Sequence, residues 1–180
     1  MFYKENKDFD ALAFGEILLR LSAPVNERMR SSTVFEKNAG GSELNVVSGI
    51  SLLGLRTGII SKIPKHDIGD YIRNNIRFSG VSDDWLIYDE RPEARLGIYY
   101  YEYGAYPRKP TVIYDRKNAS INSINMEDIP SSIFDSTRLF HTSGISLALS
   151  EESRRTAETF IRKFKEAGAK ISFDVNFRAN

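Results

Sequence analysis

Two consecutive glycines, Gly40 and Gly41, stand directly before a stretch with the apolar spacing of a helix. Glycine has no Cβ, and the first N–H groups of a helix have no partner within it, so a polyol or an anion could approach the backbone here. A tight strand-to-helix turn with one glycine at positive φ would explain the same pair. The segment matches neither the G-x-G-x-x-G pattern nor the P-loop pattern, which argues against a Rossmann dehydrogenase and a P-loop ATPase.

Three polar residues, Asp174, Asn176 and Arg178, follow a predicted strand near the end of the sequence. Their alternation places them on one side of the strand, or fans them out at its carboxyl end. Burying these polar side chains costs free energy unless they form hydrogen bonds with a ligand, with water or with one another. An ion pair between Asp174 and Arg178 is the structural alternative to a binding site.

Arg116 follows Tyr114 in another predicted strand, and its guanidinium could bind a carboxylate or phosphate through two parallel hydrogen bonds. A solvated strand residue is the alternative. His66 and His141 have no acidic residue or second histidine at ligand spacing, which favours structural histidines over metal ligands. The tyrosines within 99–106 lack an accompanying basic stripe, so they indicate sheet packing or an oligomer interface instead of nucleic-acid stacking.

The composition is that of a folded globular protein, with 41% hydrophobic and 27% charged residues in a chain of 180. Lys and Arg total 25 against 24 for Asp and Glu, and the two signs are interspersed, which argues against nucleic acid and anionic membrane as partners. Cysteine is absent, which excludes disulfides and thiolate catalysis. No run reaches the roughly 18 apolar residues of a membrane span, and we expect a cytoplasmic protein.

Alternating strand and helix patterns predict an α/β fold with a mostly parallel sheet flanked by helices. We expect strands at 10–21, 57–63, 139–141 and 170–175, and helices that begin at Ser42, Asp67 and Ser150 and end near Gly54, Phe78 and Ala167. Aromatic and β-branched stretches at 85–88, 95–103 and 111–116 predict a separate small sheet of hairpins. The sequence stops at Asn180, just after a strand end, where ligand sites of such sheets are found, so we expect a longer natural protein.

Motifs spread along nearly the whole sequence resemble, in order and spacing, the N-terminal half of the PfkB (ribokinase-like) sugar kinases. They are Phe14-Gly15-Glu16, Ala39-Gly40-Gly41 with Asn45, Asp67-x-Gly69, Gly80-Val81, Ser143-Gly144-Ile145 and Asp174-x-Asn176-x-Arg178. Within the family, the segment 142–149, Gly97-Ile98-Tyr99 and the pair Tyr114 and Arg116 are most similar to kinases of 2-keto-3-deoxygluconate.

The resemblance implies one ribokinase-like domain, of which residues 1–180 are the N-terminal part, with a small β-sheet lid formed by about 18–36 and 84–117. It implies roles for several side chains and backbone positions. The sugar would contact Gly40, Gly41, Asn45, Tyr99, Tyr114, Arg116, Ile145 and Arg178. Asn176 and Arg178 would lie near the phosphates of ATP, which would act with Mg²⁺. Apart from the resemblance, the segment from Tyr99 to Tyr106 is too apolar for an open sheet edge, so we expect the lid to form a homo-oligomer contact.

The implied substrate is an anionic sugar acid, because a guanidinium such as that of Arg116 suits a carboxylate. The family's catalytic base is an Asp in a late Gly-Ala-Gly-Asp segment that this sequence lacks. The resemblance therefore implies that the base and the rest of the ATP site follow Asn180, and that these 180 residues alone are inactive.

A fructokinase-like enzyme, a 5-dehydro-2-deoxygluconate kinase and a non-catalytic sugar-binding module are the alternatives. Two departures from the family pattern bear on the choice. Pro64 precedes the Asp67 element and fixes φ where the family often has glycine. Asp115 would repel the substrate unless strand alternation turns it away.

Overall fold

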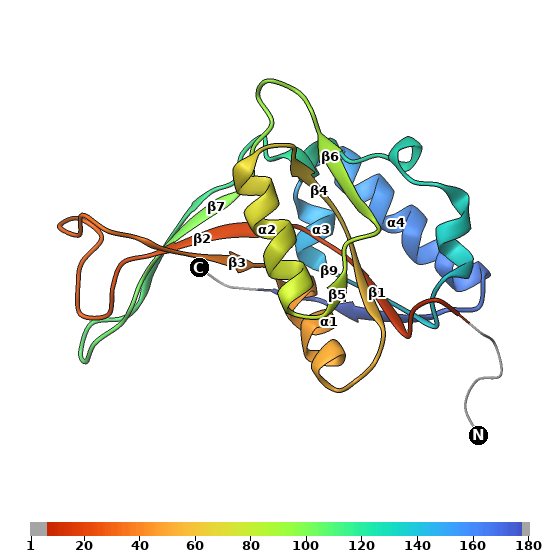
Figure 1. The fold of residues 1–180 in the computed structure, drawn as a ribbon, viewed down its shortest axis with the longest axis horizontal. Helices are drawn as coiled ribbons and strands as arrows, with labels where there is room; N and C mark the ends of the chain where they lie inside the picture. The colour runs from red at the N-terminus through yellow and green to blue at the C-terminus, as the bar shows by residue number, and fades with distance from the viewer. Residues whose placement is uncertain (1–6, 178–180) are drawn as a thin grey trace.

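The computed structural model describes residues 7–177, which form a main parallel sheet covered by helices and a second, smaller sheet that projects from it (Figure 1). The predicted α/β architecture is thereby confirmed. No helix in this part of the chain has the length and apolar character needed to cross a membrane.

The main sheet has six strands in the order β10-β9-β1-β4-β5, with β6 also pairing with β4, and every pairing in it is parallel. Its strands are β1 (Ala11–Phe14), β4 (Thr57–Pro64), β5 (Val81–Ser82), β6 (Leu86–Asp89), β9 (Leu139–Ser143) and β10 (Lys170–Asp174). Strand β1 lies between β4 and β9, so the chain turns in opposite directions on its two sides.

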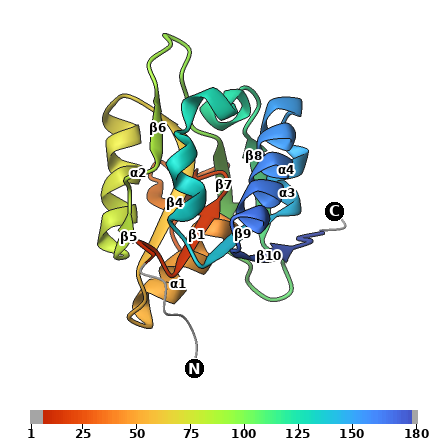
Figure 2. The ribbon, with the colours of Figure 1, turned by 90° about the vertical axis from the view of Figure 1, so that its right-hand side faces the viewer.

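Helices cover both faces of the main sheet (Figure 2). On one side lie α1 (Ser42–Leu52) and α2 (Asp67–Phe78), and on the other α3 (Gly144–Ala148) and α4 (Glu151–Glu166). Three short 3-10 helices, η1 (Ser120–Ser123), η2 (Met126–Asp128) and η3 (Ser131–Asp135), connect β8 (Thr111–Asp115) of the small sheet to β9. Alternation along β1 divides the core, because Leu12 and Phe14 pack with α4 whereas Ala13 packs with α1 and α2.

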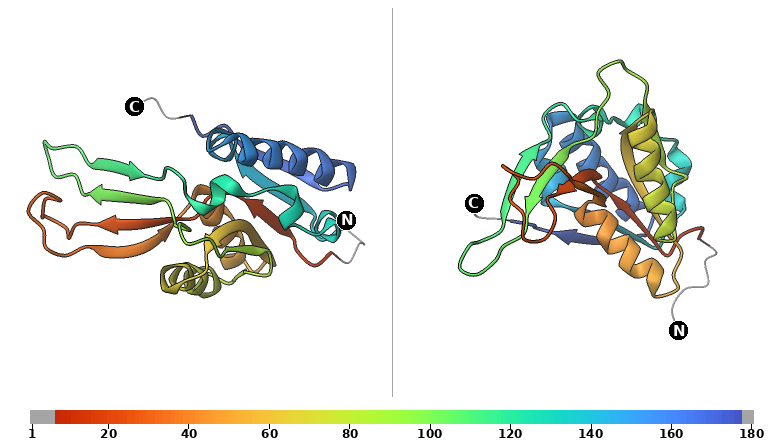
Figure 3. Two further views of the ribbon diagram at one scale, coloured as in Figure 1. Left: turned by 90° about the horizontal axis from the view of Figure 1, so that it is seen from above. Right: turned by 60° about the vertical axis from the view of Figure 1, so that its left-hand side comes forward.

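The small sheet has the order β3-β2-β7-β8 and extends beyond the helices (Figure 3). Its strands are β2 (Leu18–Ser22), β3 (Glu36–Gly40), β7 (Ile98–Glu102) and β8 (Thr111–Asp115). The β2–β3 and β7–β8 pairs are antiparallel, and β2 and β7 join them in parallel.

Two strand predictions were wrong. The apolar run 10–21 is not one strand, since it breaks at Gly15-Glu16-Ile17 and its halves, β1 and β2, belong to different sheets. The stretch 85–88 does not join the small sheet, because β6 pairs with β4 of the main sheet. Burial explains the second error, since Leu86 and Tyr88 contribute to the core between the main sheet and α2.

Helix boundaries follow the capping residues. The hydroxyl of Ser150 caps α4 by accepting from the N–H of Ser153 at 3.0 Å, and Gly168 after the helix has φ of +86°. Helix α2 spans the predicted residues, and the N-cap before it is His66, whose Nδ1 accepts from the N–H of Ile68 at 3.2 Å. His66 is therefore a capping residue.

Candidate functional site

The candidate site lies where the small sheet leaves the carboxyl ends of β1 and β9. These two strands are neighbours at the point where the chain reverses its order in the main sheet, the usual place for a ligand crevice in an open α/β sheet. From β1 the chain runs into β2 of the small sheet, and from β9 it runs into α3. The site is therefore bounded by one face of the small sheet and by the loops at the end of the main sheet.

One face of the small sheet, which we call the site face, carries four of the eight predicted sugar-binding residues. Cross-strand register places Tyr99 opposite Tyr114, with ring centroids 5.9 Å apart. A Cβ on Gly40 would lie 2.9 Å from the Tyr99 hydroxyl, so only glycine allows this ring to approach. The Arg116 guanidinium carbon lies 5.6 Å from the Tyr114 ring centroid. The structure thus brings these four residues together.

The glycine pair is required by close contacts and not by backbone handedness. Gly41 has φ of 160°, which is extended backbone, and neither glycine is among the residues with left-handed φ, so the alternative of a left-handed glycine does not explain the pair. A Cβ on Gly41 would instead lie 2.7 Å from the carbonyl oxygen of Glu16. Gly41 is the N-cap of α1, and no side chain in the described part of the molecule caps this helix. The N–H groups of its first turn can therefore serve a ligand.

Arg116 forms an ion pair with Glu16, which the sequence analysis did not assign to the site. Glu16 is only 3% exposed, and its burial raises the pKa of the carboxyl although Arg116 opposes the shift. The other carboxylate oxygen, Oε1, is buried without a hydrogen-bond partner. Gly97 makes room for it, since a Cβ at that position would collide with this oxygen.

A second buried carboxylate, that of Glu43 in the first turn of α1, ties the two sides of the site together. Its Oε1 accepts from the hydroxyls of Ser143 at 2.5 Å and Ser146 at 3.1 Å, and its Oε2 accepts from Ser42 at 2.8 Å. Glu43 is 1% exposed. This network fixes the start of α1 against the end of β9 and the start of α3, which carries Ile145.

A cleft of about 980 Å³ opens beside this junction, between the segment after β8 and the start of α3 and α4. Arg116 and Ile145 both line it, so the structure also brings these two predicted residues together. Arg91 and Lys117 add positive charge to the walls, and Glu93 and Glu152 add negative charge.

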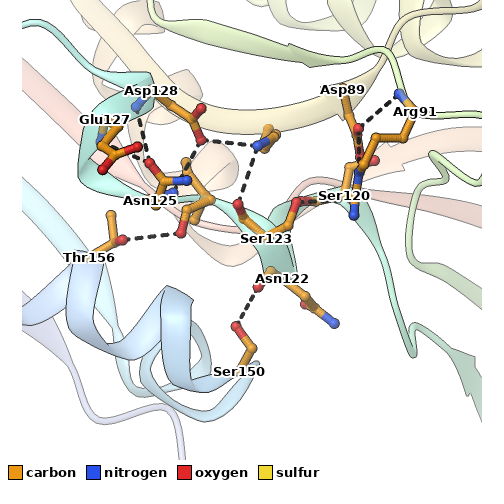
Figure 4. A network of polar contacts seen from close by, with 12 residues as sticks. Asp89, Arg91, Ser120, Asn122, Ser123, Asn125, Glu127, Asp128, Ser150 and Thr156 are labelled. Atoms are coloured by element: carbon orange, nitrogen blue, oxygen red, sulfur yellow. Dashed lines mark hydrogen bonds and ion pairs between the residues drawn. The ribbon is translucent and has the colours of Figure 1, made fainter.

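Hydrogen bonds anchor the segment that follows Arg116 to the main body (Figure 4). Ser150 donates to the carbonyl of Asn122 at 2.7 Å, and Thr156 donates to that of Ile124 at 3.2 Å. The ammonium of Lys62 donates to the carboxylate of Asp128 at 3.0 Å and to the carbonyl of Ser123 at 3.2 Å. The base of β8, and with it Arg116, is thereby held in a defined position.

Strand alternation turns Asp115 away from the site, as predicted. Its carboxylate accepts from Arg95 at 2.7 Å, and this pair lowers the pKa of Asp115. The neighbouring Arg116 lies over Tyr114 on the other side of the strand. The acid inside this strand therefore does not oppose an anionic ligand.

Asn45 and Asn176 are less closely associated with the site face than the residues above. Asn45 is exposed in the first turn of α1, where its N–H donates to the carbonyl of Gly41 at 3.0 Å. Asn176 follows β10 with φ of +47°, and its N–H donates to Asp174 at 2.8 Å. Both residues therefore belong to elements at the end of the main sheet, Asn45 to α1 and Asn176 to the segment after β10, and not to the small sheet.

The last predicted site residue, Arg178, lies outside the described residues, which end at 177. The contact of Arg178 with sugar and phosphates therefore stays a prediction. The same holds for the expectation that the catalytic base follows Asn180.

His141 has a structural place in β9, in line with the expectation from the sequence. It is buried, and its Nδ1 lies 3.0 Å from the Ser172 hydroxyl on the neighbouring strand β10. Burial lowers the pKa of its imidazole. The described residues offer it no cluster of ligands for a metal ion.

Comparison with known proteins agrees with this geometry. Residues 8–180 match the model of the pfkB family carbohydrate kinases. A 2-dehydro-3-deoxygalactonokinase of Haloferax volcanii is 35% identical to this chain, and the match covers 94% of this chain and 52% of that protein. A 2-dehydro-3-deoxygluconokinase of Bacillus subtilis is 30% identical, with a match that also covers 94% of this chain and 52% of that protein. The crystal structure of 2-dehydro-3-deoxygluconokinase from Thermotoga maritima superposes with a TM-score of 0.88 at 34% identity, covering 93% of this chain and 51% of that one.

The chain spans about half the length of the curated relatives it matches. Its two sheets, its glycine pair and the motifs at the ends of β1, β9 and β10 occur in the order and spacing noted from the sequence. The chain belongs to the pfkB family of carbohydrate kinases.

Proposed function

We propose that the protein containing this chain transfers the terminal phosphoryl group of ATP to the 6-hydroxyl of 2-keto-3-deoxygluconate. The observation that carries this proposal is the position of Arg116, on the cleft wall beside Ile145 and next to the paired rings of Tyr99 and Tyr114. A guanidinium at this place suits a sugar that ends in a carboxylate. Relatives named as kinases of such keto-sugar acids support the same substrate class.

The pair with Glu16 leaves Arg116 able to bind an anion. Glu16 accepts only from Nη2, and the Nε of Arg116 is buried without a hydrogen-bond partner. Arginine has five N–H donors, so a substrate carboxylate can bind beside Glu16 without displacing it. Glu16 then orients the guanidinium, while Tyr99 and Tyr114 confine the carboxylate from the side of the small sheet.

The other residues are assigned to positioning of the sugar and the nucleotide. Gly40, Gly41 and Asn45 offer backbone and amide groups to the sugar hydroxyls, and Ile145 forms an apolar wall. Asn176 and Arg178 lie near the phosphates in this proposal. Phosphoryl transfer depends mainly on such positioning and on stabilisation of the developing charge.

Mg²⁺ would accompany ATP and neutralise phosphate charge. Residues 7–177 contain no group of three acidic or histidine side chains that could hold a metal ion, so we assign no ligand to it. The sequence through Asn180 also lacks the late segment with the family's catalytic Asp. We therefore expect the purified 180-residue chain to show no kinase activity, and phosphorylation of the sugar acid by this chain would contradict that expectation.

A second candidate substrate is 5-dehydro-2-deoxygluconate, because a kinase of that name from Shouchella clausii is 30% identical over 98% of this chain. The test measures the rate at which the full-length protein phosphorylates each acid with ATP. The acids are 2-keto-3-deoxygluconate, 5-dehydro-2-deoxygluconate and 2-keto-3-deoxygalactonate, and the fastest rate identifies the substrate. A fructokinase-like enzyme would prefer a neutral ketose, and a non-catalytic sugar-binding module would bind sugar without consuming ATP.

We place the ATP-dependent reaction in the cytoplasm.

We also propose that the small sheet pairs with a second copy of the protein. Strand β8 is an edge of this sheet, and its Val112, Ile113 and Tyr114 are 42%, 54% and 48% exposed. Tyr106, between β7 and β8, is fully exposed. An apolar sheet edge in solvent promotes aggregation, and a partner subunit would cover it.

A further inference from the structure

Arg20, in β2, is an arginine of the site face for which the described residues supply no carboxylate. It stands opposite Tyr99 in the register of the small sheet and on the same side as Gly40. Its Nη2 lies 3.5 Å from the Tyr103 hydroxyl, and its guanidinium carbon lies 5.7 Å from the ring centroid of Tyr101. Its Nε is buried and has no hydrogen-bond acceptor.

The other arginines associated with the strands of this sheet are compensated. Arg95 pairs with Asp115, Arg108 with Glu102, and Arg116 with Glu16. A buried Nε–H without an acceptor costs free energy, because it loses its hydrogen bond to water and gains no partner in the protein. Arg20 therefore differs from its neighbours in a way that an anionic ligand would resolve.

Charge on the site face supports the same conclusion. Glu16 pairs with Arg116, whereas Arg20 forms no ion pair among the described residues and therefore adds positive charge to this face; the exposed Glu36, further out in β3, is a carboxylate on the same side. Adjacent strands are about 4.8 Å apart, which places the backbones of Arg20 in β2 and Tyr114 in β8 roughly 10 Å apart, with Tyr99 between them. An arginine side chain extends far enough to contact a sugar acid bound over these rings.

We propose that Arg20 is a substrate-binding residue that determines specificity for an anionic sugar and binds the carboxylate together with Arg116. This inference rests on the sugar-acid class of the proposed function and adds a residue to its site. Arg116 orients the carboxylate from its pair with Glu16, and Arg20 supplies the uncompensated charge.

The structural alternative is that Arg20 only packs against aromatic rings. The same sheet provides a matched control for this alternative on its opposite face. There the Lys37 ammonium lies 4.3 Å from the ring centroid of Tyr71, also as a cation over an aromatic ring. If packing explained Arg20, loss of either cation would affect stability and leave discrimination between charged and neutral ligands unchanged.

The test is calorimetric titration of the full-length protein and its Arg20→Gln, Arg20→Lys and Lys37→Gln variants. The ligands are 2-keto-3-deoxygluconate and its neutral C1 amide. We expect Arg20→Gln to weaken binding of the acid about tenfold, since a charge-assisted hydrogen bond is lost, and to leave binding of the amide within about twofold. Arg20→Lys should restore part of the affinity, and Lys37→Gln should change neither ligand.

Equal effects of Arg20→Gln on acid and amide, or no effect on either, would overturn the assignment of Arg20 while the proposed function stands. If the unmodified protein binds 2-keto-3-deoxygalactonate or 5-dehydro-2-deoxygluconate instead, the proposed substrate is wrong, and the same criterion is applied to Arg20 with that acid and its amide. Binding of neutral sugars alone would overturn both proposals.

Discussion

Arg116 and Glu16 form an ion pair that connects the end of the small sheet to the junction where the main sheet ends. Because the pair orients a guanidinium toward the cleft, Arg116→Ala in the full-length protein should weaken binding of the sugar acid. Loss of a charge-assisted hydrogen bond predicts a rise in KM of about one to two decades. Steady-state kinetics with 2-keto-3-deoxygluconate measure this change.

Arg95 provides the matched control, because it pairs with Asp115 in the same part of the sheet but away from the cleft. Arg95→Ala should leave KM within about twofold, since exposed ion pairs contribute little. An unchanged KM in Arg116→Ala, or equal effects of the two substitutions, would remove Arg116 from the substrate site.

Glu43 is predicted to be a major contributor to stability. Glu43→Ala leaves the buried hydroxyl of Ser143 without its acceptor and leaves that of Ser146 with only the more distant carbonyl of Phe14, so it should lower the free energy of unfolding by about 3 kcal/mol. Urea unfolding of the full-length protein measures this loss. Glu36→Ala is the control, because Glu36 is exposed and its removal should cost less than about 0.5 kcal/mol. Similar stabilities for both variants would contradict the network's importance.

Asp89 is predicted to contribute stability that depends on pH. Its hydrogen bonds with Arg91 hold the pKa of the carboxyl well below its usual range. An acid with a depressed folded-state pKa stabilises the protein above its unfolded pKa of about 3.9, and that contribution is lost as pH falls further. Asp89→Asn should therefore cost roughly 1 kcal/mol at pH 7, given that Arg91 is half exposed, and progressively less below about pH 4. Denaturant unfolding at several pH values measures this difference, and a constant cost from pH 3 to 7 would contradict the assignment.

The proposed subunit contact predicts a dimer that a charge on the small sheet disrupts. Light scattering of the full-length protein should give twice the monomer mass, and Ile113→Glu should give a monomer, because a buried charge would lack a partner. Tyr101 in β7 and Tyr103 just after it both contact Arg20, so a charge at either position would disturb the site as well. A dimer that survives Ile113→Glu would place the interface elsewhere.

Local sequence signals predicted much of the fold and part of the site. Helix α2 spans the predicted residues, because capping and apolar period are local properties. The break between β1 and β2 was missed, since a continuous apolar run does not reveal that its halves belong to different sheets. Glu16 and Glu43 were missed for a related reason: each has a site partner 100 residues away, Arg116 and Ser143, and their burial exists only in the fold.

The most direct test of the central claim is the acceptor preference of the full-length protein in an ATP-dependent phosphorylation assay. We predict that kcat/KM for 2-keto-3-deoxygluconate exceeds that for fructose by at least about a hundredfold, because the proposed binding of the carboxylate by Arg116 and Arg20 favours the acid. We further predict that Arg116→Ala reduces this preference at least about tenfold. Equal or greater activity on the neutral ketose, or no ATP consumption with any sugar acid, would contradict the account.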